Sequence, residues 1–330
     1  MLVNSRSKGT RRFWPAGCFT VLALLVLAII VVMLLWYLLA GRLKTPPTTP
    51  PTTTPPPTAQ SADCPDVMLL SIPGTWESSS ADDPYNPRAN PISLMLSVSG
   101  PLRAQFPDDR LEVYTVPYVA QFSNPIALPP DGQASYNVSR TEGTARATDV
   151  LAQRHKQCPL TNYVIAGFSQ GAVIAGDLAA QIGAGNGPIP ESNVLGVTVI
   201  ADGRRTATGP GQPTEIGNPP PAGEGAEVAL RGINVPGISM TGPRPGGFGT
   251  LAPKVISICA PGDMICDAPR EALNPLNALG SLGALIRSAG NPVHALYATN
   301  TVDANGTTAT QWTVNWAANL IENAPHPPHS

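Results

Sequence analysis

One serine stands between two glycines at the end of an apolar run, in Gly167-Phe168-Ser169-Gln170-Gly171. The pattern G-x-S-x-G is typical of a nucleophile elbow, a tight strand-to-helix turn in which side chains at either glycine position would clash. Such a turn places the serine at a helix N-terminus, beside oriented backbone N–H groups. A glycine-rich turn with an incidental serine would give the same letters. The apolar run before the motif and the small-residue helical pattern after it favour the elbow.

A serine nucleophile needs a base, usually histidine, and the histidine needs an orienting carboxylate. The chain has four histidines. His155 precedes the serine, in a predicted helix, and His326 and His329 lie in the terminal segment. In elbow enzymes the acid and then the histidine follow the serine along the chain. Elimination therefore indicates His294, in the loop segment AGNPVHALY, as the base; a solvated loop histidine is the alternative.

The predicted acid is Asp263, which follows the apolar run 254–260 directly and so takes a position at a strand end. Asp202 also follows an apolar run and is the main alternative. Asp177, in the predicted helix after the serine, is expected to be structural.

An oxyanion hole needs two N–H donors, of which the residue after the serine, Gln170, supplies one. The loop after an early strand supplies the other. The segment SIPGTWESS (71–79) follows the first apolar run and offers Thr75 behind Gly74. An ordinary Pro-Gly turn is the alternative interpretation of this segment.

Four cysteines lie outside the apolar N-terminal span. Cys259 and Cys266 would close a short loop around the predicted acid, which leaves Cys64 to pair with Cys158. Zinc binding is the alternative, but the sequence has no C-x-x-C and no histidine pair near these cysteines. We therefore expect two disulfides, an exported domain and no metal site.

The elements that must position these residues follow an alternating pattern. Apolar runs that indicate buried strands lie at 67–73, 111–119, 163–168, 194–201 and 254–260. Helical patterns lie at 144–157, 170–182 and 313–324. Strands that alternate with helices predict an α/β fold, a parallel sheet with helices on both faces. The Gly/Pro-rich segment 203–250 interrupts this order as a long loop.

The N-terminal region predicts attachment to a membrane. A basic cytoplasmic segment (1–12) precedes an uncharged span (13–41) that is long enough to cross a bilayer, and the larger basic cluster lies on its N-terminal side. A cleaved signal peptide is the alternative. The Pro/Thr-rich segment 42–63 predicts an extended linker. The folded domain is expected over 64–324 and an unstructured tail over 325–330.

Three motifs together resemble the cutinase family of serine esterases: GFSQGA at 167–172, CAPGDMIC at 259–266 and HALY at 294–297. The membrane-anchored cutinase-like lipases of mycolic-acid bacteria are the most similar subgroup. The resemblance implies an α/β-hydrolase fold, a three-layer sandwich around a central parallel sheet of about five strands. It also implies the two disulfides.

The resemblance gives each candidate residue a role. It implies that Ser169 is the nucleophile, His294 the base and Asp263 the acid, with Thr75 and Gln170 in the oxyanion hole. The implied enzyme is an exported, membrane-tethered esterase or lipase that needs no cofactor and hydrolyses acyl esters of lipids, as a phospholipase A, a thioesterase or a cutinase-like enzyme. Such an enzyme would belong to cell-envelope lipid metabolism.

Two other functions stay open at this point. The same acyl-enzyme could transfer its chain to a sugar hydroxyl, and the fold could serve a non-catalytic lipid-binding envelope protein. The expected partners are the lipid substrate and the membrane, and a monomer is expected, with the catalytic domain on the extracytoplasmic side of a single-pass anchor. A net charge of −2 with 13% charged residues argues against nucleic-acid binding. Segments 203–250 and 271–290 are candidate lids, with plain core packing as the alternative.

Overall fold

The computed structural model describes residues 17–40, 57–125, 127–268 and 292–330, with side chains in the first helix described only for 24–37. The chain divides into two units, Met1–Pro56 and Pro57–Ser330. The first unit contributes helix α1 (Gly17–Ala40), which contains no charged residue. Within the fully described residues, no helix is long and apolar enough to cross a membrane. The anchor at 13–41 stays a prediction.

The second unit is built on one parallel sheet of six strands, ordered β2-β1-β3-β4-β8-β5. The strands are β1 (Val67–Ile72), β2 (Leu111–Thr115), β3 (Asn162–Phe168), β4 (Val194–Ile200), β5 (Thr214–Ile216) and β8 (Val255–Ile258). Five coincide with the predicted runs, which confirms the α/β class. The expected count of about five was one short. The sixth strand, β5, has only three residues, none of them buried, so it carries no apolar pattern to detect.

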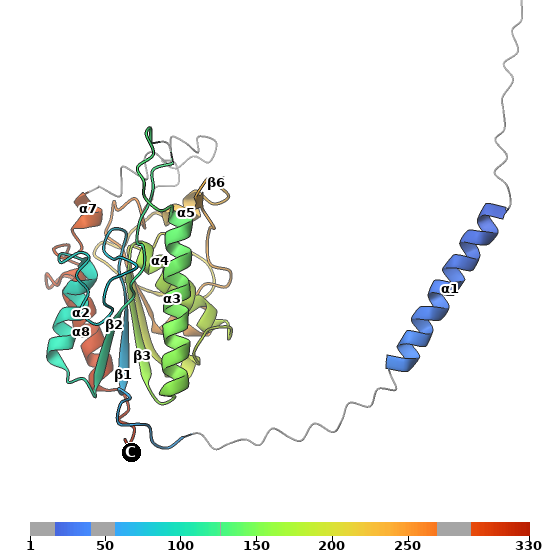
Figure 1. Cartoon of the computed structure of the whole chain (residues 1–330). Coiled ribbons are helices and arrows are strands. Elements are labelled where there is room, and N and C mark those ends of the chain that lie inside the picture. The colour runs from blue at the N-terminus through green and yellow to red at the C-terminus, as the bar shows by residue number, and fades with distance from the viewer. Residues whose placement is uncertain (1–16, 41–56, 126, 269–291) are drawn as a thin grey trace, which may run out of the picture. The chain divides into compact units, whose positions relative to one another are not determined.

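Helices cover both faces of this sheet. Figure 1 shows α2 (Leu94–Gln105) and α8 (Ala309–Glu322) on one side of the strands, with α3 (Tyr136–Gln157) and α4 (Gln170–Gly183) on the other. Alternate residues of β1 point to opposite faces, as the pleat requires. Val67 and Leu69 pack with α2 and α8, whereas Met68, Leu70 and Ile72 pack with α3 and α4. Because β1 is buried on both sides, five of its six residues are apolar.

The Gly/Pro-rich segment 203–250 forms only short elements, as its composition predicts. They are β5, α5 (Ala226–Ala229), the hairpin of β6 (Asn234–Val235) and β7 (Ile238–Ser239), and the start of a 3₁₀ helix η2 (Gly249–Lys254). A second 3₁₀ turn, η1 (Glu191–Asn193), precedes β4, and a short helix, α7 (Pro292–Ala295), precedes α8.

The terminal segment 325–330 was expected to be unstructured, and the structure corrects this. The Gln60 N–H donates to the Pro328 carbonyl at 2.9 Å, and the Ser330 N–H donates back to the Gln60 carbonyl at 3.0 Å. The buried guanidinium of Arg110 donates to several main-chain carbonyls at and after the end of α8. A buried arginine requires such partners, so Arg110, directly before β2, holds the end of α8 and the first residue of the tail.

Candidate active site

The elbow has the backbone that its sequence predicts. Ser169 follows β3 directly with φ 54° and ψ −118°, and α4 begins at the next residue. A Cβ atom at Gly167 would lie 2.3 Å from the Gly171 carbonyl oxygen. A Cβ atom at Gly171 would lie 2.1 Å from the carbonyl oxygen of Ile72, at the end of the neighbouring β1. Both glycines are therefore required by close backbone approach.

Three of the predicted residues meet at the carboxyl edge of the sheet. Ser169 Oγ lies 2.9 Å from His294 Nε2, and His294 Nδ1 lies 2.9 Å from Asp263 Oδ2. Ser169 and His294 are each 7% exposed, and Asp263 is fully buried. A hydrogen-bonded Ser–His–Asp chain is the arrangement in which imidazole can take a hydroxyl proton while a carboxylate holds the ring.

Asp263 is held by two donors besides the histidine. The Ile265 N–H donates to Oδ1 at 2.9 Å, and the buried Tyr297 hydroxyl donates to Oδ2 at 2.7 Å. Burial and then the charge of Asp263 raise the pKa of Tyr297 well above its usual value, so the phenol stays protonated and remains a donor. Sequence reasoning quoted Tyr297 only within HALY and gave it no role.

The imidazole of His294 has a second support. Its ring stacks on Phe168, the residue before the serine, with centroids 5.0 Å apart and an interplanar angle of 23°. Phe168, directly before the serine of the elbow, thus packs its aromatic ring against the predicted base.

The alternative acid, Asp202, lies in a different network. Both of its carboxylate oxygens pair with the buried guanidinium of Arg244, at 2.5 and 3.1 Å. Asp177 joins the same network through Arg140, Arg204 and Arg244. These ion pairs hold the 203–250 segment against α4, and they place Asp202 and Asp177 in structural contacts.

Thr75 and Gln170 both line the pocket that contains Ser169. Among the described residues, neither backbone N–H has a main-chain hydrogen-bond acceptor, as an oxyanion hole requires. The Gln170 side chain is held away from Ser169, because its Oε1 accepts from Ser139 Oγ at 2.7 Å.

A partly buried carboxylate fixes the loop that carries Thr75. Glu77 Oε2 accepts the Gly74 N–H at 2.9 Å, and Oε1 accepts the Leu94 N–H at 2.5 Å. Burial raises the pKa of Glu77, and these two backbone donors partly offset the increase. Glu77 connects the loop of Thr75 to the start of α2. Sequence reasoning missed it, since nothing local distinguishes it from a surface glutamate.

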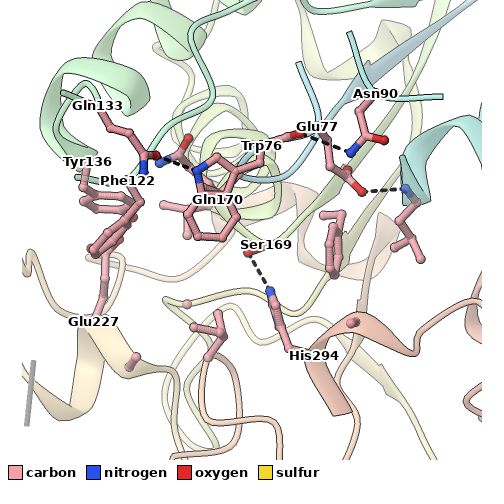
Figure 2. A pocket seen from close by; sticks show the side chains of 18 of the residues that line it. Trp76, Glu77, Asn90, Phe122, Gln133, Tyr136, Ser169, Gln170, Glu227 and His294 are labelled. Atoms are coloured by element: carbon pink, nitrogen blue, oxygen red, sulfur yellow. Dashed lines mark hydrogen bonds between the residues drawn. The ribbon is translucent and has the colours of Figure 1, made fainter. Parts of the chain in front are cut away.

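The pocket has a volume of about 500 Å³ and is mainly apolar. Figure 2 shows Ser169 and His294 at its centre, with Phe122 and Tyr136 on one side and Glu77 and Asn90 on the other. The segment 203–250 contributes part of the wall: Gly203, Ala226, Glu227 and Met240. The second candidate lid, 271–290, lies outside the described residues.

The cysteines pair as predicted. Disulfides join Cys64 to Cys158 and Cys259 to Cys266. The second bridge spans the loop that carries Asp263, so it limits the freedom of the predicted acid.

Comparison with known proteins gives consistent matches. A family model described as Cutinase matches residues 88–278. The "Carboxylesterase Culp6 homolog" of Corynebacterium glutamicum is 49% identical over 269 residues, which cover 79% of this chain and 82% of that protein. The catalytic core domain of acetyl xylan esterase from Trichoderma reesei is 20% identical with a TM-score of 0.48, over 79% of this chain and 100% of that one. A cutinase-like protein from Cryptococcus sp. is 19% identical with a TM-score of 0.48, over 82% of this chain and 100% of that one.

The family model covers more than half of this chain, and the Corynebacterium relative shares almost half of the aligned residues. The chain therefore belongs to the cutinase family and is a serine carboxylic ester hydrolase.

Proposed function

We propose that the chain is an exported, membrane-tethered serine esterase that hydrolyses acyl esters of envelope lipids. The observation that carries the proposal is the hydrogen-bonded chain Ser169–His294–Asp263, which opens into a largely apolar cavity of about 500 Å³. A cavity of that size and polarity suits an acyl chain. The apolar α1 segment and the Pro/Thr-rich linker support the tether.

In the proposed mechanism, Ser169 Oγ attacks the ester carbonyl carbon while His294 Nε2 takes the hydroxyl proton. Asp263 stabilises the imidazolium that forms. The N–H groups of Thr75 and Gln170 donate to the oxyanion of the tetrahedral intermediate. Its collapse breaks the ester bond, and the imidazolium returns the proton to the leaving alcohol. Water then attacks the acyl-enzyme in the same way, which releases the carboxylic acid and restores Ser169.

The test uses the full-length chain in detergent with p-nitrophenyl esters of two to sixteen carbons. Ser169→Ala is expected to reduce turnover by about 10⁶-fold, to the background rate, while the exposed Ser192→Ala control retains it. A fluorescent phosphonate should label wild type and the control but not Ser169→Ala. Unchanged turnover in Ser169→Ala would refute the proposal, and a folded wild type that neither turns over nor labels would favour a binding role.

The membrane tether has its own test. The full chain is expected in the membrane fraction of its host, and a chain without residues 1–41 is expected in the soluble fraction with its esterase activity intact. Equal distribution of both chains would exclude the tether and leave the esterase proposal standing.

A further inference from the structure

Trp76 has an uncommon backbone conformation directly beside the oxyanion residue Thr75. Its φ is 64°, in the left-handed region that a bulky side chain rarely adopts. The backbone is held there from both sides, because its N–H donates to the Ala120 carbonyl at 2.6 Å and its carbonyl accepts from Asn90 Nδ2 at 3.2 Å. Strained residues of this kind gather at ligand clamps and active sites, so the side chain that this backbone aims is a candidate for function.

The indole of Trp76 is hydrogen-bonded to a segment far from it in the sequence. Its Nε1 donates to Gln133 Oε1 at 2.6 Å. The Gln133 segment is itself closed by Asp131, whose carboxylate accepts the N–H groups of Gln133 at 3.1 Å and Asn124 at 2.7 Å. The hydrogen bond therefore adds a side-chain link between the Trp76 loop and the connection from β2 to α3, which the Trp76 N–H also contacts at Ala120.

Trp76 and Gln133 lie where the pocket meets solvent. Both line the cavity, and Trp76 is nevertheless 50% exposed. Figure 2 shows the indole between Gln133 and Ser169, with the hydrogen bond drawn as a dashed line. Ser169 is only 7% exposed although it faces a cavity of about 500 Å³. The indole therefore lies beside a path by which an ester can approach the serine.

We propose that the Trp76–Gln133 hydrogen bond is a latch at the mouth of the pocket that selects straight acyl chains against branched ones. This inference rests on the proposed function of Ser169. A slender chain passes beside the closed latch, whereas a chain branched next to the carbonyl needs the indole to move and the hydrogen bond to break. A half-exposed hydrogen bond of this kind corresponds to about a two- to tenfold effect on kcat/KM.

The test compares two isomeric substrates, p-nitrophenyl hexanoate and p-nitrophenyl 2-ethylbutanoate, on the full-length chain in detergent. Trp76→Phe keeps an aromatic ring but loses the indole N–H. Gln133→Ala removes the acceptor and leaves the sequence of the Thr75 loop unchanged. Each variant is expected to raise the branched-to-linear ratio of kcat/KM by about two- to tenfold. The double variant should show no more than either single variant, because both remove the same bond.

Matched controls make the same two kinds of substitution at residues that do not line the pocket. Trp312→Phe, on α8, and Gln105→Ala, on the exposed end of α2, are expected to leave the ratio at its wild-type value. An unchanged or lowered ratio in Gln133→Ala would overturn the latch, as would additive effects in the double variant. Should Trp76→Phe fail to fold, Gln133→Ala alone decides. Turnover that survives in Ser169→Ala refutes the proposed function instead, so the two failures are distinguishable.

Discussion

Replacement of Gly171 by alanine tests how the elbow and the loop of Thr75, which carries a predicted oxyanion donor, depend on each other. A methyl group there would lie 2.1 Å from the Ile72 carbonyl oxygen and 2.4 Å from the Pro73 carbonyl oxygen. Ordinary van der Waals contact begins at 3.4 Å, so the two backbones must separate by about 1.3 Å. Pro73 leads directly into the loop of Thr75, and the displacement therefore moves one predicted oxyanion donor away from the other.

A misplacement of about 1 Å costs on the order of 100-fold in rate, so we expect kcat of Gly171→Ala to fall by about 100-fold. Overpacking should also lower the free energy of unfolding by about 1–3 kcal/mol. The assay combines kcat for p-nitrophenyl butyrate, corrected for the fraction of chains that a phosphonate labels, with urea unfolding. KM should change little because the apolar wall of the pocket is untouched.

Gly100 provides the matched control. It lies in α2, and a Cβ atom there would meet nothing within 4 Å. Gly100→Ala should leave kcat unchanged and raise the free energy of unfolding by up to about 1 kcal/mol, because alanine is the better helix former. A Gly171→Ala enzyme that is folded and keeps kcat within about threefold of wild type would refute the reasoning.

Four further substitutions separate the predicted catalytic carboxylate from structural ones. Asp263→Asn should lower kcat by about 10⁴-fold. Asp202→Asn removes one of the two carboxylates that pair with the buried Arg244, so it should cost about 3–5 kcal/mol in urea unfolding while kcat per labelled enzyme is preserved. The opposite pattern would exchange their roles. Glu77→Gln leaves one loop N–H without an acceptor and should lower kcat about tenfold at constant KM; a change in KM alone would contradict this. Burial alone would raise the pKa of Asp177. The charges of Arg244, Arg140 and Arg204 lower it by more, so the pKa lies below its usual value. Its ionised form therefore adds stability above pH about 4, and the deficit of Asp177→Asn in urea unfolding should shrink as the pH falls further; a deficit independent of pH would refute this.

The sequence predicts much of the fold because its signals are local. The β3 run ends in an elbow, and Gly167 is required there by a contact with Gly171, four residues away. Cys259 and Cys266 lie close enough along the chain to suggest their own pairing. The structure also places Ser169, His294 and Asp263 in hydrogen-bond contact, as their spacing predicts, although their catalytic roles remain predictions.

Features that depend on distant contacts could not be predicted in this way. Tyr297 and Glu77 become important only through partners that folding brings from elsewhere in the chain: Tyr297 donates to Asp263, and Glu77 accepts from the start of α2. Arg244 lies in a segment whose composition indicates a loop, yet its guanidinium is 4% exposed and pairs with two carboxylates. Helix α2 was missed because Gly100 and Pro101 interrupt its pattern, while Leu94, Met95, Val98 and Leu102 still bury one face.

The pairing of Gln60 with the last residues brings the two ends of the domain together. The hydrogen bonds of Gln60 with Pro328 and Ser330 lie at the amino-terminal end of the strands, whereas Ser169 lies at their carboxyl-terminal end. A short peptide that joins residues 330 and 60 would therefore close the chain into a ring without crossing the pocket. New ends could be opened at Gly185, an exposed turn with φ 77° and free space around it. The domain is thus a suitable scaffold for circular permutation, with fusion partners or surface attachment placed away from substrate entry.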